Sequence, residues 1–258
     1  MDLGIDGLRV LITAGAAGIG LEIARAFVGE GARVQVCDVD EAALDALATT
    51  DPALGRTRCD VADRADVARL FADGIERLGG LDCLVNNAGI AGPTGRIDEI
   101  DPADWDRCIA IDLTGQFNCL RLAVPHLRRS RNASIMNVSS LAGRHGFPLR
   151  TPYAAAKWGV IGLTRSLAME LGADGIRVNA LLPGIVAGDR QRRVLEAKAK
   201  VRGISFEEME RTAFSFTSIR EYVTPRQLAD LAVFVASPRA RTISGQALSV
   251  CGDTNMLG

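Results

Sequence analysis

A tyrosine and a lysine four residues apart, in Tyr153-Ala154-Ala155-Ala156-Lys157, have the residue types and the spacing for proton transfer. In a helix, residues four apart lie on one face, so the phenol and the ammonium would be neighbours. A free phenol keeps its proton up to a pH of about 10. A nearby cation favours the phenolate and lowers the pKa of the tyrosine, so Tyr153 could exchange a proton with a substrate near neutral pH.

A serine precedes this tyrosine by thirteen residues, in the segment Asn137-Val138-Ser139-Ser140. Ser140 follows an apolar run that is typical of a buried strand, and ligands bind where such strands end. Its hydroxyl is expected to reach a substrate oxygen that Tyr153 also contacts. A serine hydrolase is disfavoured, because no nucleophile elbow surrounds Ser140 and His126 and His145 have no evident acidic partner. Of the two histidines, His145 is the better candidate for lining a substrate pocket.

A glycine-rich segment, Thr13-Ala14-Gly15-Ala16-Ala17-Gly18-Ile19-Gly20, joins the first predicted strand to the first predicted helix. Glycines let the backbone approach a pyrophosphate, and the helix that starts at Gly18 offers free N–H groups and a positive dipole end. Tight strand–helix turns also need glycine for steric reasons, so the segment alone is weak evidence. Its place after the first strand strengthens the interpretation as a dinucleotide site.

An acidic residue, Asp38, follows Gly20 by eighteen positions at the end of the second predicted strand. A carboxylate there would accept hydrogen bonds from both hydroxyls of an adenine ribose and would repel a 2′-phosphate. Ala16, Ala17 and Val39 supply no cation for such a phosphate. The sequence therefore favours NAD over NADP. The alternative interpretation is that Asp38 is simply a helix cap.

Strands and helices alternate along the whole chain. Short apolar runs predict strands at residues 8–13, 32–37, 56–59, 81–85, 133–138, 176–182 and 246–250. Helical periodicity and capping residues predict helices at 18–31, 41–48, 63–78, 101–127, 152–171 and 224–236. This alternation, without a linker, predicts one doubly wound Rossmann-type α/β domain over residues 1–258, with a parallel sheet of about seven strands flanked by helices.

The segment at about 185–222 breaks this rhythm and is expected to form two short helices. The first is basic, with Arg190, Arg192 and Arg193, and the second is capped by Ser205 with Glu208. Because the segment follows the end of a strand, it is expected to be a substrate lid; a surface helix pair for oligomer contacts is the alternative. The arginines, Arg190 in particular, could bind an anionic group, or they could form a solvated helix face.

The bulk composition excludes several classes of protein. A net charge of −1 gives no field that favours nucleic acid or an anionic membrane. No apolar run approaches the roughly 20 residues of a membrane helix, and the N-terminus lacks the pattern of a signal peptide. The six cysteines are scattered without a CxxC pair, so neither disulfides nor a metal site is expected. A reducing cytoplasm is the simplest expectation.

Taken together, these motifs resemble the classical short-chain dehydrogenase/reductase family from about residue 5 to 252. The resemblance implies that Ser140 orients the substrate oxygen, that Tyr153 is the general acid and base, and that Lys157 lowers the pKa of the tyrosine and binds the nicotinamide ribose. It also implies a cofactor site along the glycine loop and the strand ends. The implied cofactor contacts are Gly15, Gly18, Ile19, Gly20, Asp38, Asp60, Val61, Asn87, Ala88, Gly89, Pro183, Gly184 and Val186, with Tyr153 and Lys157.

The chain departs from the family's pattern at three places. Ala14 replaces the first loop glycine, and Gly15 is expected to supply the flexibility instead. Asp112 replaces an asparagine whose backbone carbonyl joins a proton relay to the lysine; aspartate keeps that carbonyl, so activity should survive. Val250-Cys251-Gly252-Asp253 replaces a common Val-Asp-Gly-Gly.

The primary expectation is reversible NAD-linked hydride transfer to or from a secondary alcohol, such as a sugar, polyol, hydroxy acid or ring alcohol. One alternative is an NADPH-dependent ketone reductase of the 3-oxoacyl type, and another is an NAD-binding sensor or scaffold without turnover. The family resemblance further implies a homo-oligomer, a tetramer or a dimer, formed through the helices at Pro102–Leu127 and Pro152–Leu171. Apolar residues of the second helix, Val160, Ile161, Leu163 and Leu167, would pack at that interface.

Overall fold

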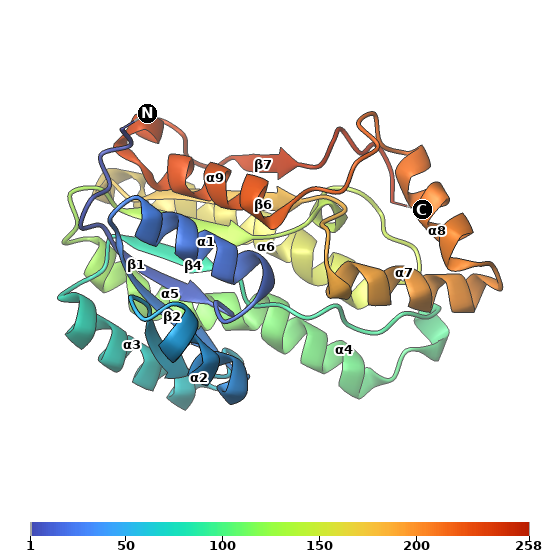
Figure 1. Ribbon diagram of the computed structural model, residues 1–258, viewed down its shortest axis with the longest axis horizontal. Coiled ribbons are helices and arrows are strands. Elements are labelled where there is room, and N and C mark those ends of the chain that lie inside the picture. Colours follow the sequence, from blue (N-terminus) through green and yellow to red (C-terminus); the bar gives the residue numbers. More distant parts are fainter. Residues whose placement is uncertain (1, 258) are drawn as a thin grey trace.

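A parallel sheet of seven strands forms the centre of the molecule in the computed structural model, which describes residues 2–257. The strand order is β3-β2-β1-β4-β5-β6-β7, and every pair is parallel. The predicted doubly wound α/β fold is therefore confirmed (Figure 1). The strands are β1 (Arg9–Thr13), β2 (Arg33–Asp38), β3 (Gly55–Arg58), β4 (Cys83–Asn86), β5 (Ser134–Val138), β6 (Arg177–Pro183) and β7 (Ala247–Val250).

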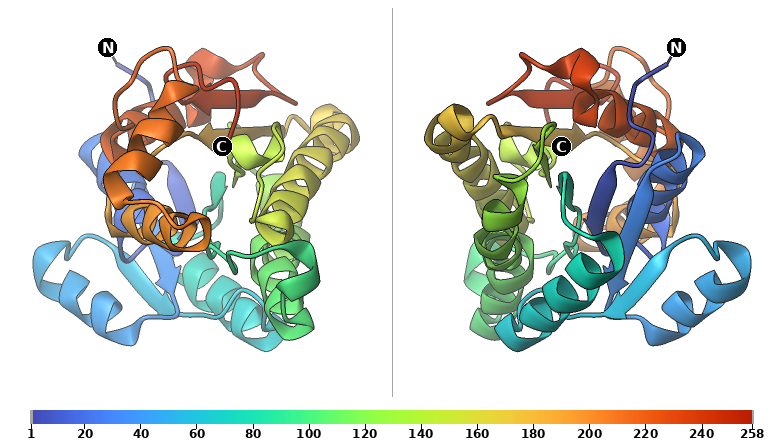
Figure 2. Two further views of the ribbon diagram at one scale, coloured as in Figure 1. Left: turned by 90° about the vertical axis from the view of Figure 1, so that its right-hand side faces the viewer. Right: turned by 90° about the vertical axis from the view of Figure 1, so that its left-hand side faces the viewer.

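Helices cover both faces of this sheet, as the end-on views show (Figure 2). α1 and α9 pack together on one face, where Ile23, Phe27 and Leu228 join Val10 and Ile12 in one buried cluster. α3, α5 and α6 cover the other face, over Leu11, Leu84 and Ile135. Alternate residues of β1 thus face opposite layers, as a strand with a period of two requires. The helices on the two faces are α1 (Gly18–Gly29), α2 (Glu41–Thr50), α3 (Arg64–Leu78), α5 (Gly115–Leu127), α6 (Thr151–Leu171) and α9 (Pro225–Ala236).

Side-chain caps fix where three of these helices begin, namely α2, α3 and α9. The Asp63 carboxylate accepts the N–H of Ala65 at 2.7 Å, so Asp63 lies just outside α3. Thr224 and Gln227 form the predicted capping box that starts α9. Each cap satisfies backbone donors that the first helical turn leaves without a partner. The sequence therefore located these boundaries to within one or two residues.

The helix predicted over residues 101–127 is interrupted. α4 (Pro102–Ile109) and α5 are joined by a π-helical turn at Ala110–Thr114, which contains Asp112. A π turn inserts one extra residue into the helical ladder and is frequent at functional sites. The prediction of one unbroken α-helix is therefore wrong at this turn.

Two further helices, α7 (Asp189–Arg202) and α8 (Phe206–Ser215), lie between β6 and α9. They stand beyond the carboxyl ends of the strands, at the end of the molecule where the C-terminus lies (Figure 1). Leu195 and Ala199 of α7 pack with Met209 of α8 in a small buried cluster of their own. The predicted capping box of Ser205 and Glu208 starts α8. Within the described residues, no helix is both long and apolar enough to span a bilayer.

Candidate active site

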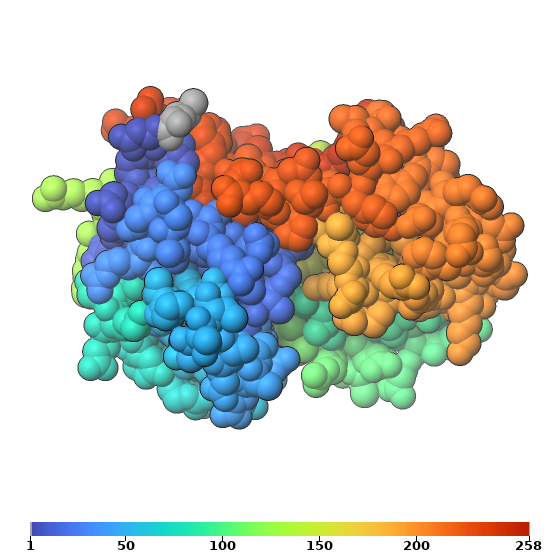
Figure 3. All heavy atoms as spheres, viewed as in Figure 1, coloured from blue at the N-terminus to red at the C-terminus, as the bar shows by residue number. Residues whose placement is uncertain are grey.

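The predicted site residues gather at one edge of the sheet. β1 runs into the glycine loop, β2 ends at Asp38, β4 ends at Asn86 and β5 ends at Val138. Since all seven strands are parallel, these ends lie on the same edge, which is where open α/β sheets bind ligands. The space-filling view shows the surface hollowed between the blue N-terminal region and the amber α7 (Figure 3).

The glycine loop turns through a left-handed residue that is not glycine. Ala14 has a φ of 50°, whereas Gly15 does not have a positive φ. The expectation that Gly15 supplies the flexibility is therefore wrong. Gly15 is needed for space, because a Cβ there would lie 2.7 Å from the Cβ of Val36. A Cβ on Gly20 would likewise collide with the carbonyl oxygen of Ala14.

The N-terminus of α1 is open to an anion. Its N-cap residue, Ala17, provides no side-chain cap, whereas Asp40, Asp63 and Asp101 cap α2, α3 and α4 with their carboxylates. Gly18 has a φ of 54°, and a Cβ on it would meet nothing within 4 Å. Uncapped N–H groups that face open space fit the diphosphate of a dinucleotide. Ile19 continues the same first turn.

Asp38 lies beside this loop at the end of β2. Its Oδ2 accepts the N–H of Ala16 at 3.2 Å, and its Oδ1 accepts the N–H groups of Val39 and Asp40 at 2.8 and 3.2 Å. The cap of α2 is Asp40, whose carboxylate accepts the N–H of Ala43. The alternative interpretation of Asp38 as a helix cap is therefore wrong. The carboxylate therefore lies against the glycine loop.

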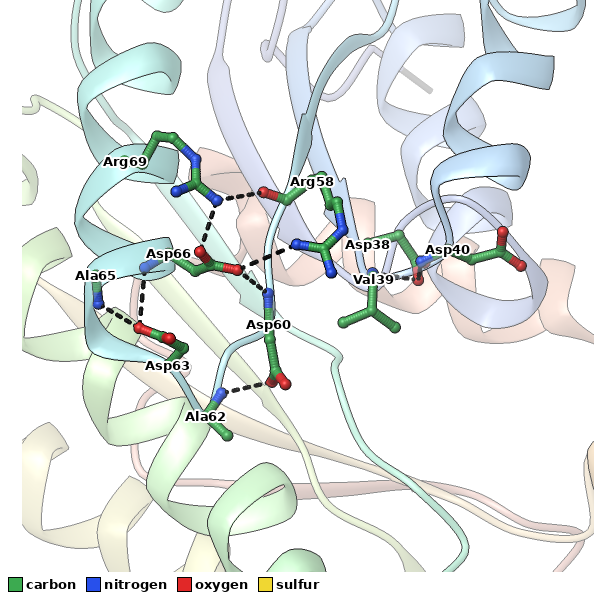
Figure 4. A network of polar contacts seen from close by, with 10 residues as sticks. All are labelled: Asp38, Val39, Asp40, Arg58, Asp60, Ala62, Asp63, Ala65, Asp66 and Arg69. Atoms are coloured by element: carbon green, nitrogen blue, oxygen red, sulfur yellow. Dashed lines mark hydrogen bonds and ion pairs between the residues drawn. The ribbon is translucent and has the colours of Figure 1, made fainter.

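A cation that the sequence analysis missed, Arg58, is the strand neighbour of Asp38. The two residues are paired in the register of β2 and β3, and the Arg58 side chain is exposed. Its Nη1 lies 3.7 Å from Oδ2 of Asp66 on α3 (Figure 4). Only the pairing register could have revealed this neighbour, because Arg58 is twenty residues beyond Asp38 in the chain.

Asp60 follows β3 and belongs to the same network (Figure 4), and Val61 is the next residue of the chain. The N–H of Asp60 donates to Asp66 at 3.0 Å, and the Asp60 carboxylate accepts the N–H of Ala62 at 2.9 Å. The N–H of Asp60 and the guanidinium of Arg69 hold the pKa of Asp66 below its usual value. Val61 is buried, whereas Asp60 is half-buried.

The segment after β4 holds the glycine loop in place. Asn87 donates from Nδ2 to the carbonyl oxygens of Thr13 and Ala14 at 3.0 and 2.9 Å. The Thr13 hydroxyl accepts the N–H groups of Asn87 and Ala88 at 3.0 and 2.9 Å. Asn87 therefore has a structural task in addition to the cofactor contact that the resemblance implies. Its bond to Ala14 constrains the strained peptide.

Tyr153 and Lys157 lie on one face of α6, as their spacing predicted. Lys157 is buried, and its Nζ lies 5.5 Å from the centre of the Tyr153 ring. The same Nζ donates to the carbonyl oxygen of Val138 at 3.2 Å. Ser140 stands two residues after Val138, where its Oγ accepts the N–H of Ala142 at 3.2 Å. The structure thus brings the end of β5 against the tyrosine–lysine pair.

Asp112 reaches the same group from the π turn. Its Oδ2 lies 3.5 Å from the Nζ of Lys157, and its Oδ1 accepts the N–H of Ile90 at 2.7 Å. Oδ2 has no hydrogen-bond partner among residues 2–257. The ion pair with Lys157 is therefore the main interaction that this oxygen makes. Both side chains are buried, so the pair is screened little by solvent.

The strand end at β6 leads to the substrate side of the site. Pro183 ends β6, and a Cβ on Gly184 would lie 2.7 Å from the Cα of Cys251. Val186 forms an isolated parallel bridge with Val223. Arg190, at the start of α7, donates from Nη1 to the carbonyl oxygen of Gly89 at 2.9 Å. The helix pair is thereby tied to the segment after β4.

A cavity of about 400 Å³ lies between α7 and the 89–92 segment, and three arginines line it. Arg190 and Arg193 come from α7, as the sequence suggested. Arg192, on the same helix, does not line the cavity; it is exposed and pairs with Glu196 at 2.9 Å. The third arginine, Arg150, was missed. His145 is half-buried and lines neither this cavity nor a smaller one beside it that Phe147 lines.

Arg150 did have a signal in the sequence. It stands three residues before Tyr153 at the predicted start of a helix. A cation at a helix N-terminus opposes the helix dipole, and arginine has no acceptor with which to cap it. Such a residue needs another reason to be there.

No cluster of three His, Cys, Asp or Glu side chains in the described part of the chain could hold a metal ion.

Comparisons with known proteins agree with this geometry. Residues 14–253 match the sequence-family model described as enoyl-(acyl carrier protein) reductase. The chain is 34% identical over 252 residues to the 3-oxoacyl-(acyl-carrier-protein) reductase of Thermotoga maritima, covering 96% of this chain and 98% of that one. It is 34% identical over 246 residues to the D-beta-hydroxybutyrate dehydrogenase of Cupriavidus necator, covering 93% and 95%.

A solved structure of an actinorhodin polyketide ketoreductase with NADPH superimposes with a TM-score of 0.88 at 34% identity, covering 94% of this chain and 95% of that one. The chain therefore belongs to the classical short-chain dehydrogenase/reductase family. It is an oxidoreductase that acts on hydroxyl or keto groups, with a fold that binds a nicotinamide cofactor.

Proposed function

We propose that this chain interconverts a secondary alcohol and a ketone with NAD as the hydride carrier. One arrangement carries the proposal: Tyr153 and Lys157 lie on one face of α6, and Lys157 contacts the end of β5 two residues before Ser140, beside a loop that fits a dinucleotide. Hydride transfer at a carbinol carbon needs a group that moves the hydroxyl proton and a group that orients the oxygen. This chain has one residue for each task.

Tyr153 moves the proton. In the direction of oxidation its phenolate takes the hydroxyl proton of the substrate, and in the direction of reduction its phenol returns that proton. The ammonium of Lys157, near the ring, stabilises the negative charge on the phenolate. When bound, nicotinamide supplies the hydride donor or acceptor at the substrate carbon. The hydroxyl of Ser140 holds the substrate oxygen.

Asp112 is a positioning residue in this scheme. It contacts Lys157 and the backbone of Ile90, and it keeps the ammonium fixed under the 89–92 segment. A buried cation without a counter-charge is costly, so the carboxylate stabilises the charged form of the lysine.

The preference for NAD rests on Asp38. Its carboxylate would accept hydrogen bonds from the two adenine-ribose hydroxyls and would repel a 2′-phosphate. A second candidate, an NADPH-dependent ketone reductase, is favoured by one specific observation: Arg58 lies next to Asp38 and could pair with that phosphate. Two relatives, a 3-oxoacyl reductase and a ketoreductase with NADPH, point the same way. We favour NAD, because Asp38 makes its contacts at the loop itself while Arg58 is directed toward Asp66.

The segment at residues 185–222 is proposed to be the substrate lid of a single domain. Its helices stand beyond the strand ends, and Arg190 already contacts Gly89 across the cavity. The substrate classes considered are sugars, polyols, hydroxy acids and ring alcohols. The names of the relatives span acyl-chain and hydroxybutyrate substrates, so they do not select one class.

Assembly into a homo-oligomer, a dimer or a tetramer, is also proposed. Of the apolar residues named for the interface, Val160 is fully buried within the chain, so it cannot contact a second subunit. Ile161, Leu163 and Leu167 are half-buried, and their place in an interface stays a prediction. Other large apolar side chains are exposed instead: Phe117 on α5, with Trp158 and Met169 on α6. The cytoplasm is proposed as the compartment, because all six cysteines are free thiols.

Substitution of the tyrosine tests the proposed function. Alcohols, sugars and hydroxy acids are screened with both nicotinamides by the absorbance of the reduced cofactor, and the best substrate is used with Tyr153→Phe. The expected result is a fall in kcat of about 100-fold or more with unchanged cofactor affinity, because a general acid–base group is lost. The comparison is Tyr222→Phe, since Tyr222 is the chain's other tyrosine and its hydroxyl donates to Glu210 of α8. Near-normal turnover by Tyr153→Phe would remove it from this role.

A further inference from the structure

The cavity beside Tyr153 has an unusual charge. Three of its ten lining residues are arginines, and none of the ten is aspartate or glutamate. Among residues 2–257, no carboxylate forms an ion pair with Arg150, Arg190 or Arg193. A concave surface lined by one sign of charge concentrates ligands of the other sign. The cavity therefore selects an anionic group.

Arg150 is the residue that makes this more than a basic surface. Its exposed fraction is 2%, so the guanidinium has been taken out of water. Nη2 donates to the carbonyl oxygen of Ala91, but Nε and Nη1 have no hydrogen-bond partner in the described part of the chain. Nε carries one N–H bond and Nη1 carries two, so three of five donors are without an acceptor. Burial lowers the pKa of this guanidinium.

The surroundings of Arg150 offset only a small part of the free energy that its burial costs. It stands at the N-terminus of α6, where the helix dipole disfavours a cation. Aromatic rings of Phe147 and Tyr153 lie 5.5 and 5.4 Å from its Cζ, which stabilises the cation only in part. Arg190, at the mouth of the same cavity, adds like charge. Natural structures leave few buried donors without partners, so these donors indicate a ligand that supplies the acceptors.

The cavity also adjoins the proposed catalytic group. The ring of Tyr153 is a direct neighbour of the Arg150 guanidinium, and the cavity wall at Gly89 and Ile90 is the segment that contacts Asp112 and Arg190. The Arg150 guanidinium connects the two, because it lines the cavity and lies 5.4 Å from the centre of the tyrosine ring. A substrate held by both residues would carry its anionic group within a few bonds of the reacting carbon.

We propose that Arg150, assisted by Arg190 and Arg193, forms a carboxylate subsite, so that the substrate is a short hydroxy acid or its oxo acid. The inference rests on the proposed function and names its substrate class. A carboxylate has the acceptors that a guanidinium fork needs, and a cavity of about 400 Å³ suits a small acid. Because the substrate's carboxylate would be bound in the ground state and in the transition state alike, the subsite acts mainly on KM.

Paired substrates provide the kinetic test. Short hydroxy acids are compared with their own methyl esters, which keep the reacting carbon and lose the charge. We expect wild-type kcat/KM to be at least about 10-fold higher for the acid, and Arg150→Gln to lower it about 10- to 100-fold for the acid, mainly through KM. The ester should change by less than about 3-fold. Arg150→Lys should restore part of the loss, because it returns the charge without the fork.

The matched control is a surface arginine of α7, the helix that carries Arg190 and Arg193. Arg192→Gln removes an equal charge from α7 but leaves the cavity lining intact, because Arg192 is exposed and paired with Glu196. It should leave the preference for acids unchanged, whereas Arg190→Gln should reduce it. Arg190 is exposed, so its variant tests the subsite even if Arg150→Gln does not fold.

A binding measurement separates this inference from the proposed function. Propionate, with propionamide as its uncharged match, is added to the NAD-saturated wild type and to Tyr153→Phe, and binding is followed by saturation-transfer NMR. Both proteins should bind propionate and not propionamide, and Arg150→Gln should bind neither. If no alcohol is turned over but propionate binds through Arg150, the proposed function fails and the subsite stands. If neutral alcohols are used through Tyr153 with no preference for acids, and propionate does not bind, the subsite is refuted and the proposed function stands.

Discussion

The carboxylate of Asp112 lies 3.5 Å from the ammonium of Lys157, and both groups are buried. The family pattern has an asparagine at the position of Asp112, so this chain adds a negative charge within the proton-transfer group. The charge favours the ammonium form of Lys157 and offsets part of the positive field that reaches Tyr153. This relationship makes the first prediction possible.

Asp112→Asn should keep activity. Asparagine keeps the acceptor for the Ile90 N–H and the backbone carbonyl, so turnover should fall by less than about 10-fold. Asp112→Leu is the comparison, because it also removes the acceptor for the Ile90 N–H. A complete loss of turnover in Asp112→Asn would contradict this account of the residue.

Asp38→Ser should relax the cofactor preference. The substitution removes the charge that repels a 2′-phosphate and leaves Arg58 as the nearest strand neighbour. Affinity for NADP relative to NAD should rise about 10- to 100-fold, measured by cofactor titration. Adding Arg58→Ala should cancel part of the gain, because the phosphate then has no guanidinium nearby. An unchanged ratio in Asp38→Ser would show that Asp38 does not set the preference.

Ala14→Gly should stabilise the protein. A non-glycine residue in the left-handed conformation costs roughly 1–2 kcal/mol, and glycine would relieve this cost. The greater freedom of glycine in the unfolded chain cancels about 0.4–1 kcal/mol of that stabilisation. Ala14 has a φ of 50°, so a net increase of about 0.5–1 kcal/mol in the free energy of unfolding is expected. Urea denaturation measures it. Gly15→Ala, where a Cβ would meet Val36 at 2.7 Å, should have the opposite sign. Destabilisation by Ala14→Gly would show that Ala14 carries no strain.

Asp82→Asn should destabilise the fold near neutral pH but not at strongly acidic pH. Burial alone would raise the pKa of Asp82, but the guanidinium of Arg9 and the hydroxyl of Ser130 outweigh it and lower that pKa. An aspartate with a lowered folded-state pKa stabilises the protein fully above its unfolded value of about 3.9 and loses that contribution as the pH falls through the folded value.

The difference between wild type and Asp82→Asn should therefore be constant from about pH 7 to about pH 5 and shrink below about pH 4. Its size near neutrality should be about 1–3 kcal/mol, since Asp82 accepts two guanidinium hydrogen bonds at 2.7 and 2.8 Å. Urea denaturation at several pH values follows it. A difference that stays the same down to pH 3 would rule out the ionised carboxylate as its source.

Trp158→Glu should weaken subunit association. Trp158 on α6 and Phe117 on α5 are large apolar side chains on the surface of the single chain, and a charge there cannot be buried between subunits. Sedimentation velocity should show a smaller species. Arg226→Glu on α9 is the control, because Arg226 is exposed and pairs only with its helix neighbour Asp230 at 2.7 Å. A wild-type chain that sediments as a monomer would remove the proposed assembly.

Local signals were sufficient for most of the fold. Apolar runs located β1, which leads into the glycine loop, and β2, which ends at Asp38. The Thr224 capping box located α9, because strand burial and helix capping are decided by near neighbours in the chain. The π turn at Asp112 gave no such signal, since it is an extra residue within a continuous helical pattern.

The candidate site divides in the same way. Tyr153 and Lys157 are neighbours through helical spacing, so the sequence alone could place them together. Arg58 was missed because it reaches the site through strand register, and Arg150 because its burial depends on the 89–92 segment, which is distant in the chain. The left-handed Ala14 was assigned to its neighbour Gly15, because composition favours glycine for such a backbone while the surrounding hydrogen bonds decide which residue adopts it.

The hydrogen bond from Arg190 to the carbonyl oxygen of Gly89 joins the substrate helices to a segment that borders the cofactor in this family. Any displacement of that carbonyl when nicotinamide binds is transmitted to the arginine. Thermodynamic linkage makes such an effect mutual: the factor by which cofactor raises the affinity for an acid equals the factor by which the acid raises the affinity for cofactor. We therefore expect this single peptide oxygen to couple the binding of the two ligands.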